Sequence, residues 1–252
     1  MPLNYSRKMT GRHRSIDANR QLGLALAFVA GATNAGGFLA VQMYTSHMTG
    51  VVSSMADNLA LAQFDLVLAA LGALLSFIVG AAISAMLVNY SRVHELHSQY
   101  ALPLMVEACL LLLFGLLGAR LSDIDGLFVS VTVMLLSFIM GLQNAVITKL
   151  SNAEIRTTHI TGIVTDIGIE IGKLAYRNPP GTPAPERILA NRPRLALLSC
   201  LAAAFFGGGV IGALGFKHVG YSATVPLALM LVALASVPIA DDIRRLLGRK
   251  KA

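Results

Sequence analysis

The feature that most constrains this chain is a set of long stretches without any charged side chain. Residues 21–56, 66–91, 126–148, 195–216 and 218–240 contain no Asp, Glu, Lys or Arg. Each is long enough to cross the hydrocarbon core of a bilayer, which takes about 20 apolar residues in a helix. The whole chain is 13% charged, whereas soluble domains carry about 25% charged residues. The sequence therefore predicts an all-α polytopic protein embedded in the lipid bilayer.

The apolar segments fall into two length classes. Two stretches, 48–62 and 159–175, are too short to span and are predicted as re-entrant or half-helices. Whether they re-enter or cross stays open from the residues alone. A basic segment, 1–20, precedes the membrane domain, and a basic tail, 241–252, follows it. The six predicted transmembrane helices are 21–43, 66–88, 102–119, 126–148, 195–217 and 221–240.

The basic residues predict the orientation in the membrane. With six spans and a cytoplasmic N-terminus, 18 of the 20 Lys and Arg residues fall on the cytoplasmic side, whereas eight spans would leave 16 there. Because basic residues concentrate in cytoplasmic loops, six spans with both termini in the cytoplasm fit better. The net charge of +7 is thus explained by topology. No nucleic-acid partner is expected, because no aromatic residues alternate with the basic ones as stacking platforms.

A repeated motif divides the membrane domain into two units. Residues 45–50, TSHMTG, match residues 157–162, TTHITG, and each copy follows a long apolar segment that contains Asn-Ala. Each motif opens a short apolar stretch and precedes two more spans, so the units are 21–119 and 126–240. A unit of three spans is odd, and the second copy must therefore start from the opposite face. The sequence predicts a 3+3 inverted-topology repeat, a construction found in many secondary transporters.

The doubled motif, together with the preceding Asn-Ala pairs, resembles the YoaK-like family of bacterial integral membrane proteins. The resemblance covers most of residues 20–245. It implies a location in the bacterial inner membrane and a family of unknown function. It implies no catalytic residue.

The motifs predict a solute-binding site near the bilayer midplane. Thr49 and Thr161 can cap the backbone N–H groups of a following helix, and the glycines after them allow a ligand to approach closely. Two half-helix N-termini would meet there, and their positive ends favour an anionic or strongly polar solute. The alternative is a pair of interfacial helices whose histidines face water. The predicted binding residues are Asn34, Thr45, His47, Thr49, Gly50, Asn144, Thr157, His159, Thr161 and Gly162.

Few acids lie in the apolar segments, and such acids are usually functional because their burial in a membrane is costly. Asp57, Asp166, Glu170 and Glu107 are the candidates for coupling a proton or a cation to transport. Two alternatives weaken this prediction. Glu170 can pair with Lys173 on the same helix face, and Glu107 lies close enough to the end of its span to extend toward the interface.

Three functions remain open from the sequence. The leading hypothesis is a small secondary transporter or permease for a small polar or anionic solute, and the small size favours a homodimer. The second is a membrane scaffold or regulatory protein that recruits a partner through its basic cytoplasmic segments. The third is a membrane-embedded enzyme acting on lipid, which is disfavoured because no catalytic motif occurs. Cys109 and Cys200 have no metal-ligand or disulfide spacing, so neither metal nor cofactor is expected.

Overall fold

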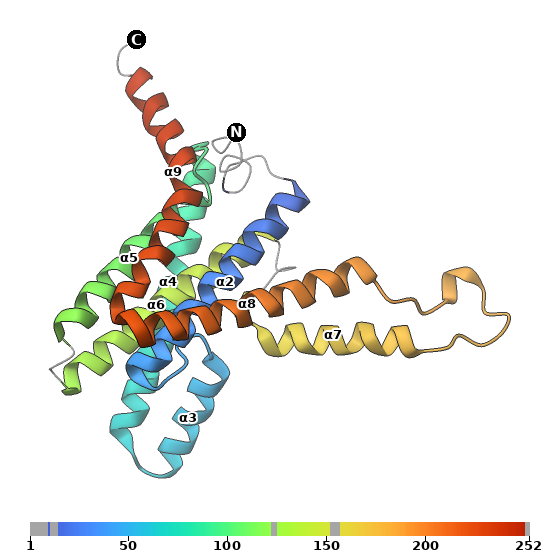
Figure 1. Ribbon diagram of the computed structural model, residues 1–252, viewed down its shortest axis with the longest axis horizontal. Coiled ribbons are helices and arrows are strands. Elements are labelled where there is room, and N and C mark those ends of the chain that lie inside the picture. Colours follow the sequence, from blue (N-terminus) through green and yellow to red (C-terminus); the bar gives the residue numbers. More distant parts are fainter. Residues whose placement is uncertain (1–9, 11–14, 122–124, 152–156, 250–252) are drawn as a thin grey trace.

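A computed structural model describes residues 10, 15–121, 125–151 and 157–249 of the chain. Most of the predicted basic N-terminal segment and the last three residues of the tail lie outside these described residues. Within them, the regular structure consists of α-helices and two short 3-10 helices, with no strand (Figure 1). The elements are α2 (Ile16–Val41), α3 (Met48–Ala60), α4 (Phe64–Val93), α5 (Ala101–Leu121), α6 (Asp125–Leu150), α7 (Ile160–Ala175), η1 (Ala184–Glu186), α8 (Arg192–Val219), η2 (Gly220–Ala223) and α9 (Thr224–Arg249).

The long helices match the predicted spans and extend beyond them. Five stretches of the described residues are long and apolar enough to cross a membrane, and the last, Arg192–Leu247, contains both α8 and α9. Three helices extend five or more residues beyond their predicted bounds. α2 begins at Ile16 and not at residue 21, α4 continues past residue 88 to Val93, and α9 runs through most of the basic tail to Arg249, because polar residues can extend a helix beyond its apolar run. α3 and α7, with 13 and 16 residues, are not among the candidate spans.

Local sequence explains where several helices begin and end. The hydroxyl of Ser15 accepts a hydrogen bond from the N–H of Ala18 at 3.2 Å and caps α2. Asn191 caps α8 in the same way, through the N–H of Arg194 at 3.0 Å. α2 ends where Gln42 adopts a left-handed conformation with φ of 54°. The chain thus turns sharply just before the first TSHMTG motif.

Four glycines allow two pairs of helices to cross in backbone contact. A Cβ atom added to Gly31 of α2 would overlap the carbonyl oxygen of Phe205 in α8, and one added to Gly208 would overlap that of Phe28. The α4–α6 pair repeats this arrangement: Gly80 faces the carbonyl of Phe138, and Gly141 faces that of Phe77. Each of these helices therefore carries the sequence Phe-x-x-Gly at its crossing point. Small residues permit such close approach between membrane helices.

The contacts also define the directions of the helices. α2 and α8 run parallel, because Phe28 lies beside Gly208 and Gly36 beside Phe216. α2 and α6 run antiparallel, because Asn19 near the start of α2 donates to the carbonyl of Leu150 at the end of α6, at 3.4 Å. α5 and α9 are also antiparallel. Gly115 in the last part of α5 contacts Thr224 at the start of α9, while the N–H of Ser98, just before α5, donates to Asp242 near the end of α9 at 2.8 Å.

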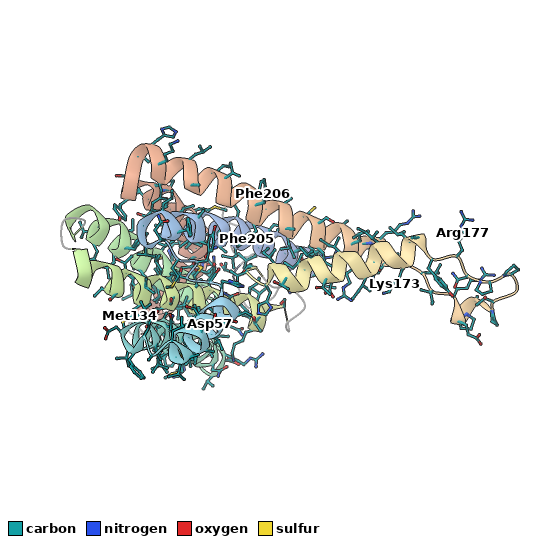
Figure 2. The ribbon with its side chains drawn as sticks, turned by 90° about the horizontal axis from the view of Figure 1, so that it is seen from below. Asp57, Met134, Lys173, Arg177, Phe205 and Phe206 are labelled. Atoms are coloured by element: carbon teal, nitrogen blue, oxygen red, sulfur yellow. The ribbon has the colours of Figure 1, made fainter. Side chains whose placement is uncertain are left out.

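The two short helices form hairpins with the helices that follow them. α3 lies against α4, and α7 lies against α8. In Figure 1 the α7–α8 hairpin, yellow and orange, extends away from the rest of the helices. Figure 2 shows Lys173 and Arg177 toward the outer end of this arm and Asp57 on α3 in the body of the molecule. The start of each short helix, where the repeated motif lies, is thereby brought toward the centre.

Candidate functional site

The two repeated motifs have the same local structure. His47 occupies the N-cap position of α3 with φ and ψ of −94° and 71°, and His159 occupies that of α7 with −82° and 53°. Neither N-terminus has a side-chain capping hydrogen bond. The prediction that Thr49 and Thr161 cap these helices is therefore wrong, because each helix begins one residue before its threonine. We call residues 45–50 the first turn and residues 157–162 the second turn.

The same hydrogen bond occurs in both halves of the molecule and holds each turn in place. The Oδ1 atom of Asn34 in α2 accepts from the hydroxyl of Ser46 at 2.9 Å. The Oδ1 atom of Asn144 in α6 accepts from the hydroxyl of Thr158 at 2.6 Å. The sequence predicted that both asparagines bind the solute. In the structure, the oxygens of both asparagines hold the two turns, and Asn144 also lines the pocket between them.

Both turns line one central pocket of about 660 Å³. The pocket lies between the middle of α4 and the second half of α6, where Phe77, Gly141 and Asn144 contribute to its wall. The sequence predicted that the two turns lie together. In the structure, residues of both turns line this cavity. The residues that the turns contribute are Ser46, His47, Met48, Thr49, Thr158, His159, Ile160 and Thr161.

The electrostatic character of the central pocket is positive. Of the described residues that line it, only Lys149 at the end of α6 has a formal charge, and its Nζ atom donates to Asn89 at 2.9 Å. The first N–H groups of a helix have no intrahelical acceptor and carry a partial positive charge. α3 and α7 both present such an uncapped end to the pocket. Two exposed histidines, His47 and His159, add ring nitrogens that can donate hydrogen bonds.

Lys149 is a residue of the site that sequence reasoning did not identify. Its position beyond the fourth apolar segment suggested only a contribution to membrane orientation. The available signal was proximity along the chain, because Lys149 lies only ten residues before His159.

Several predicted site residues do not line the central pocket. Thr45 and Thr157, the first residues of the two turns, are fully buried, and their hydroxyls have no hydrogen-bond partner in the described part of the chain. Gly50 and Gly162 line two neighbouring cavities instead. Asn34 and all four acids proposed for ion coupling also lie outside the central pocket: Asp57, Glu107, Asp166 and Glu170.

Two of those acids are engaged in specific contacts. Asp166 on α7 forms an ion pair with Arg194 of α8 at 2.9 Å. Glu170, one turn further along α7, accepts from Lys173 at 2.9 Å and from the backbone N–H of Asn191 at 2.6 Å. The Glu170–Lys173 pair confirms the alternative that the sequence suggested for Glu170, and the contacts with Asn191 and Arg194 connect α7 to the start of α8. The carboxylates of Asp166 and Glu170 are already partnered, which argues against a role in coupling.

The other two acids have opposite environments. Asp57 is exposed on α3. Glu107 is completely buried in α5, with Leu104 and Leu111 of the same helix in the surrounding apolar core. Neither of its carboxylate oxygens has a hydrogen-bond partner among the residues that the structure describes. The interpretation in which Glu107 extends to the membrane interface is therefore wrong for this conformation.

The comparison with known families covers nearly all of this architecture. The chain matches the family model described as "Protein of unknown function (DUF1275)" over residues 22–237. The chain belongs to the DUF1275 family. The matched region of this DUF1275 member runs from α2 into α9 and includes both turns. No curated protein and no solved structure matches the chain. The family description assigns no activity, in agreement with the expectation of a family without known function.

Proposed function

We propose that this protein is a small secondary transporter or permease of the bacterial inner membrane, with the central pocket as its solute site. The observation that carries the proposal is the meeting of both repeated turns in one cavity. Secondary transporters often bind their solutes between repeats, where interrupted helices present their N-termini. The YoaK-like resemblance is part of this proposal, and it implies the same bacterial setting.

An inverted repeat is supported by the directions of equivalent helices. The sequence match pairs α2 with α6, which run antiparallel, and the order of elements pairs α5 with α9, which also run antiparallel. Helices that cross the membrane in opposite directions are expected to be equivalent only when the two units are inverted. Eight spans would make α5 and α9 parallel, so the antiparallel contact between Ser98 and Asp242 favours six spans with α3 and α7 as half-helices.

The charge of the pocket supports an anionic or strongly polar solute. Among the described residues, its lining contains Lys149 and no acid, and two uncapped helix ends face it. An anion would be stabilised by both helix ends and by hydrogen bonds from the two turns. Among the acids, Glu107 is the best candidate for coupling transport to a proton, because a carboxyl buried without a partner is costly to retain. The proposed orientation places both termini in the cytoplasm, and the small size favours a homodimer.

The first experiment tests the topology of the two short helices. In a background with Cys109 and Cys200 replaced, Gln63→Cys in the α3–α4 connection and Ala184→Cys in the α7–α8 connection are probed separately in intact cells with a membrane-impermeant thiol reagent, because both residues are exposed and neither lines the central pocket. We expect labelling of Gln63→Cys from outside, whereas Ala184→Cys reacts only in inside-out vesicles. Labelling of both from one face would contradict the inverted repeat and remove the main support for a transporter.

The second experiment tests the pocket itself. Purified protein in detergent is heated with inorganic phosphate, sulfate, nitrate or acetate, and unfolding is followed by far-UV circular dichroism. A solute present at about 100 times its Kd stabilises the folded state by about 2.7 kcal/mol, so we expect the midpoint to rise by several degrees with at least one anion. His47→Ala and His159→Ala should each abolish that rise and the uptake of the same anion into proteoliposomes.

The histidine variants should leave the fold intact, because both side chains are exposed. His94→Ala is the matched control, since this exposed histidine lies in the α4–α5 connection and does not line the pocket. Unchanged uptake in both turn variants would refute the proposed site. Stabilisation by none of the four anions would refute its anionic character.

A further inference from the structure

Two further cavities lie next to the turns, one beside each turn, and Arg20 of α2 also lines the one beside the second turn. The smaller, of about 230 Å³, is lined by His47 and Gly50 of the first turn. The larger, of about 800 Å³, is lined by Gly162 of the second turn and by Asp166 and Arg194. His47 lines the central pocket as well as the smaller cavity. Gly162 of the larger cavity is the next residue in the chain after Thr161, which lines the central pocket.

The two outer cavities occupy equivalent places in the two halves. The motif match pairs Gly50 with Gly162 and Ser54 with Asp166, and each pair contributes one residue to each cavity. The matching Phe-x-x-Gly segments of α4 and α8 pair Phe77 with Phe205. The same register pairs residue 70 with residue 198, which line the smaller and the larger cavity respectively. Equivalent cavities on opposite units are what access from two faces requires.

The equivalent hairpins are held together differently. On the larger cavity, the Asp166–Arg194 ion pair joins α7 to α8 at 2.9 Å. The corresponding residues of the first half are Ser54 and Leu66, which cannot form an ion pair. The Ser54 hydroxyl instead accepts from Asn58 of its own helix at 3.1 Å. Only the second hairpin therefore has an electrostatic connection at this position.

We propose that Asp166 and Arg194 are a positioning pair that holds α7 against α8 and thereby limits access from the larger cavity to the central pocket. α7 packs mainly against α8, so the position of the second turn at its N-terminus depends on this contact. Asp166 lies one helical turn beyond Gly162, between the second turn and the outer end of the hairpin. The ion pair is partly exposed, and partly exposed pairs contribute little stability, which suits a contact that opens and closes. This inference rests on the proposed function.

The test measures access to the second turn without requiring a known solute. In the background lacking Cys109 and Cys200, Thr161→Cys is the reporter, and its reaction with a positively charged methanethiosulfonate reagent is timed in the purified full-length protein. Asp166→Asn and Arg194→Gln should each raise the rate about two- to fivefold, the range expected for a partly exposed ion pair. The double exchange Asp166→Arg with Arg194→Asp should restore the original rate. A purely structural role for the pair would not produce this recovery together with unchanged unfolding midpoints.

Asp57→Asn is the matched control, because it removes an acid from α3 without affecting the pair, and it should leave the rate unchanged. Equal rates with and without the pair would overturn the positioning role while leaving the proposed function standing. Absence of any reaction at Thr161→Cys would overturn both, since the central pocket would then not be accessible from water. Rates that respond to the pair, combined with failure of every anion to bind, would support the positioning role and refute the proposed solute.

Discussion

Gly208→Ala is expected to lower the free energy of unfolding by about 3 kcal/mol, the upper part of the range for overpacking a tight interface. The added methyl group would overlap the carbonyl oxygen of Phe28, a backbone atom that cannot rotate away. α2 and α8 would have to separate, and the reciprocal contact between Gly31 and Phe205 would be lost with them. Because the chain contains no Trp, unfolding is best followed by far-UV circular dichroism in detergent.

The neighbouring Gly207→Ala is the matched control for this prediction. No atom lies within 4 Å of a Cβ placed at Gly207, and Ala stabilises a helix by up to about 1 kcal/mol relative to Gly. The two adjacent substitutions should therefore change stability in opposite directions. Equal effects at both positions would mean that α2 and α8 do not cross as described.

Glu107→Met is expected to raise the free energy of unfolding by about 1 to 3 kcal/mol, while removing the proposed coupling of transport to protons. Met has nearly the volume of Glu and removes two oxygens that have no hydrogen-bond partner in the described part of the molecule. Replacing a buried, unsatisfied polar group by an apolar one of similar shape is neutral or stabilising. The stability measurement uses thermal unfolding, and coupling is measured as uptake with and without an imposed pH gradient.

Glu170→Met provides the opposite comparison. This acid is also buried, but it accepts hydrogen bonds from Lys173 and from the N–H of Asn191. Its removal breaks both of these contacts of α7, so we expect Glu170→Met to lower the unfolding midpoint. If Glu107→Met were destabilising to the same extent, Glu107 would have a partner and would lose its distinction as the coupling acid.

Much of the fold could be predicted because each long helix has its own apolar segment. The self-match of TSHMTG and TTHITG also indicated that the two turns belong together, and both line one cavity. The Phe-x-x-Gly crossings were equally visible in the sequence, at Phe28, Phe77, Phe138 and Phe205. Their pairing could not be predicted, because four similar Phe-x-x-Gly segments do not show which helices cross one another.

The roles of individual polar residues could not be predicted, because they depend on contacts between helices. Asn34 reaches Ser46 only after α2 has ended and the chain has turned at Gln42. Asp166 forms its ion pair with Arg194 because a 16-residue connection, 176–191, brings α8 back along α7. The sequence shows that these residues are polar in apolar surroundings, but it does not show which neighbour is their hydrogen-bond or ion-pair partner.

Each helix crossing joins segments that are far apart in the chain, so the two partners of a crossing are synthesised at different times. The crossing partner of α2 is α8, and Gly208 leaves the ribosome about 180 residues after Phe28, roughly 10 to 40 seconds later at ordinary rates of translation. During that interval the face of α2 that contains Gly31 cannot pack against α8. A nascent first half in the membrane is therefore exposed to mispairing with another nascent copy, and to surveillance by membrane proteases, until α8 has been inserted.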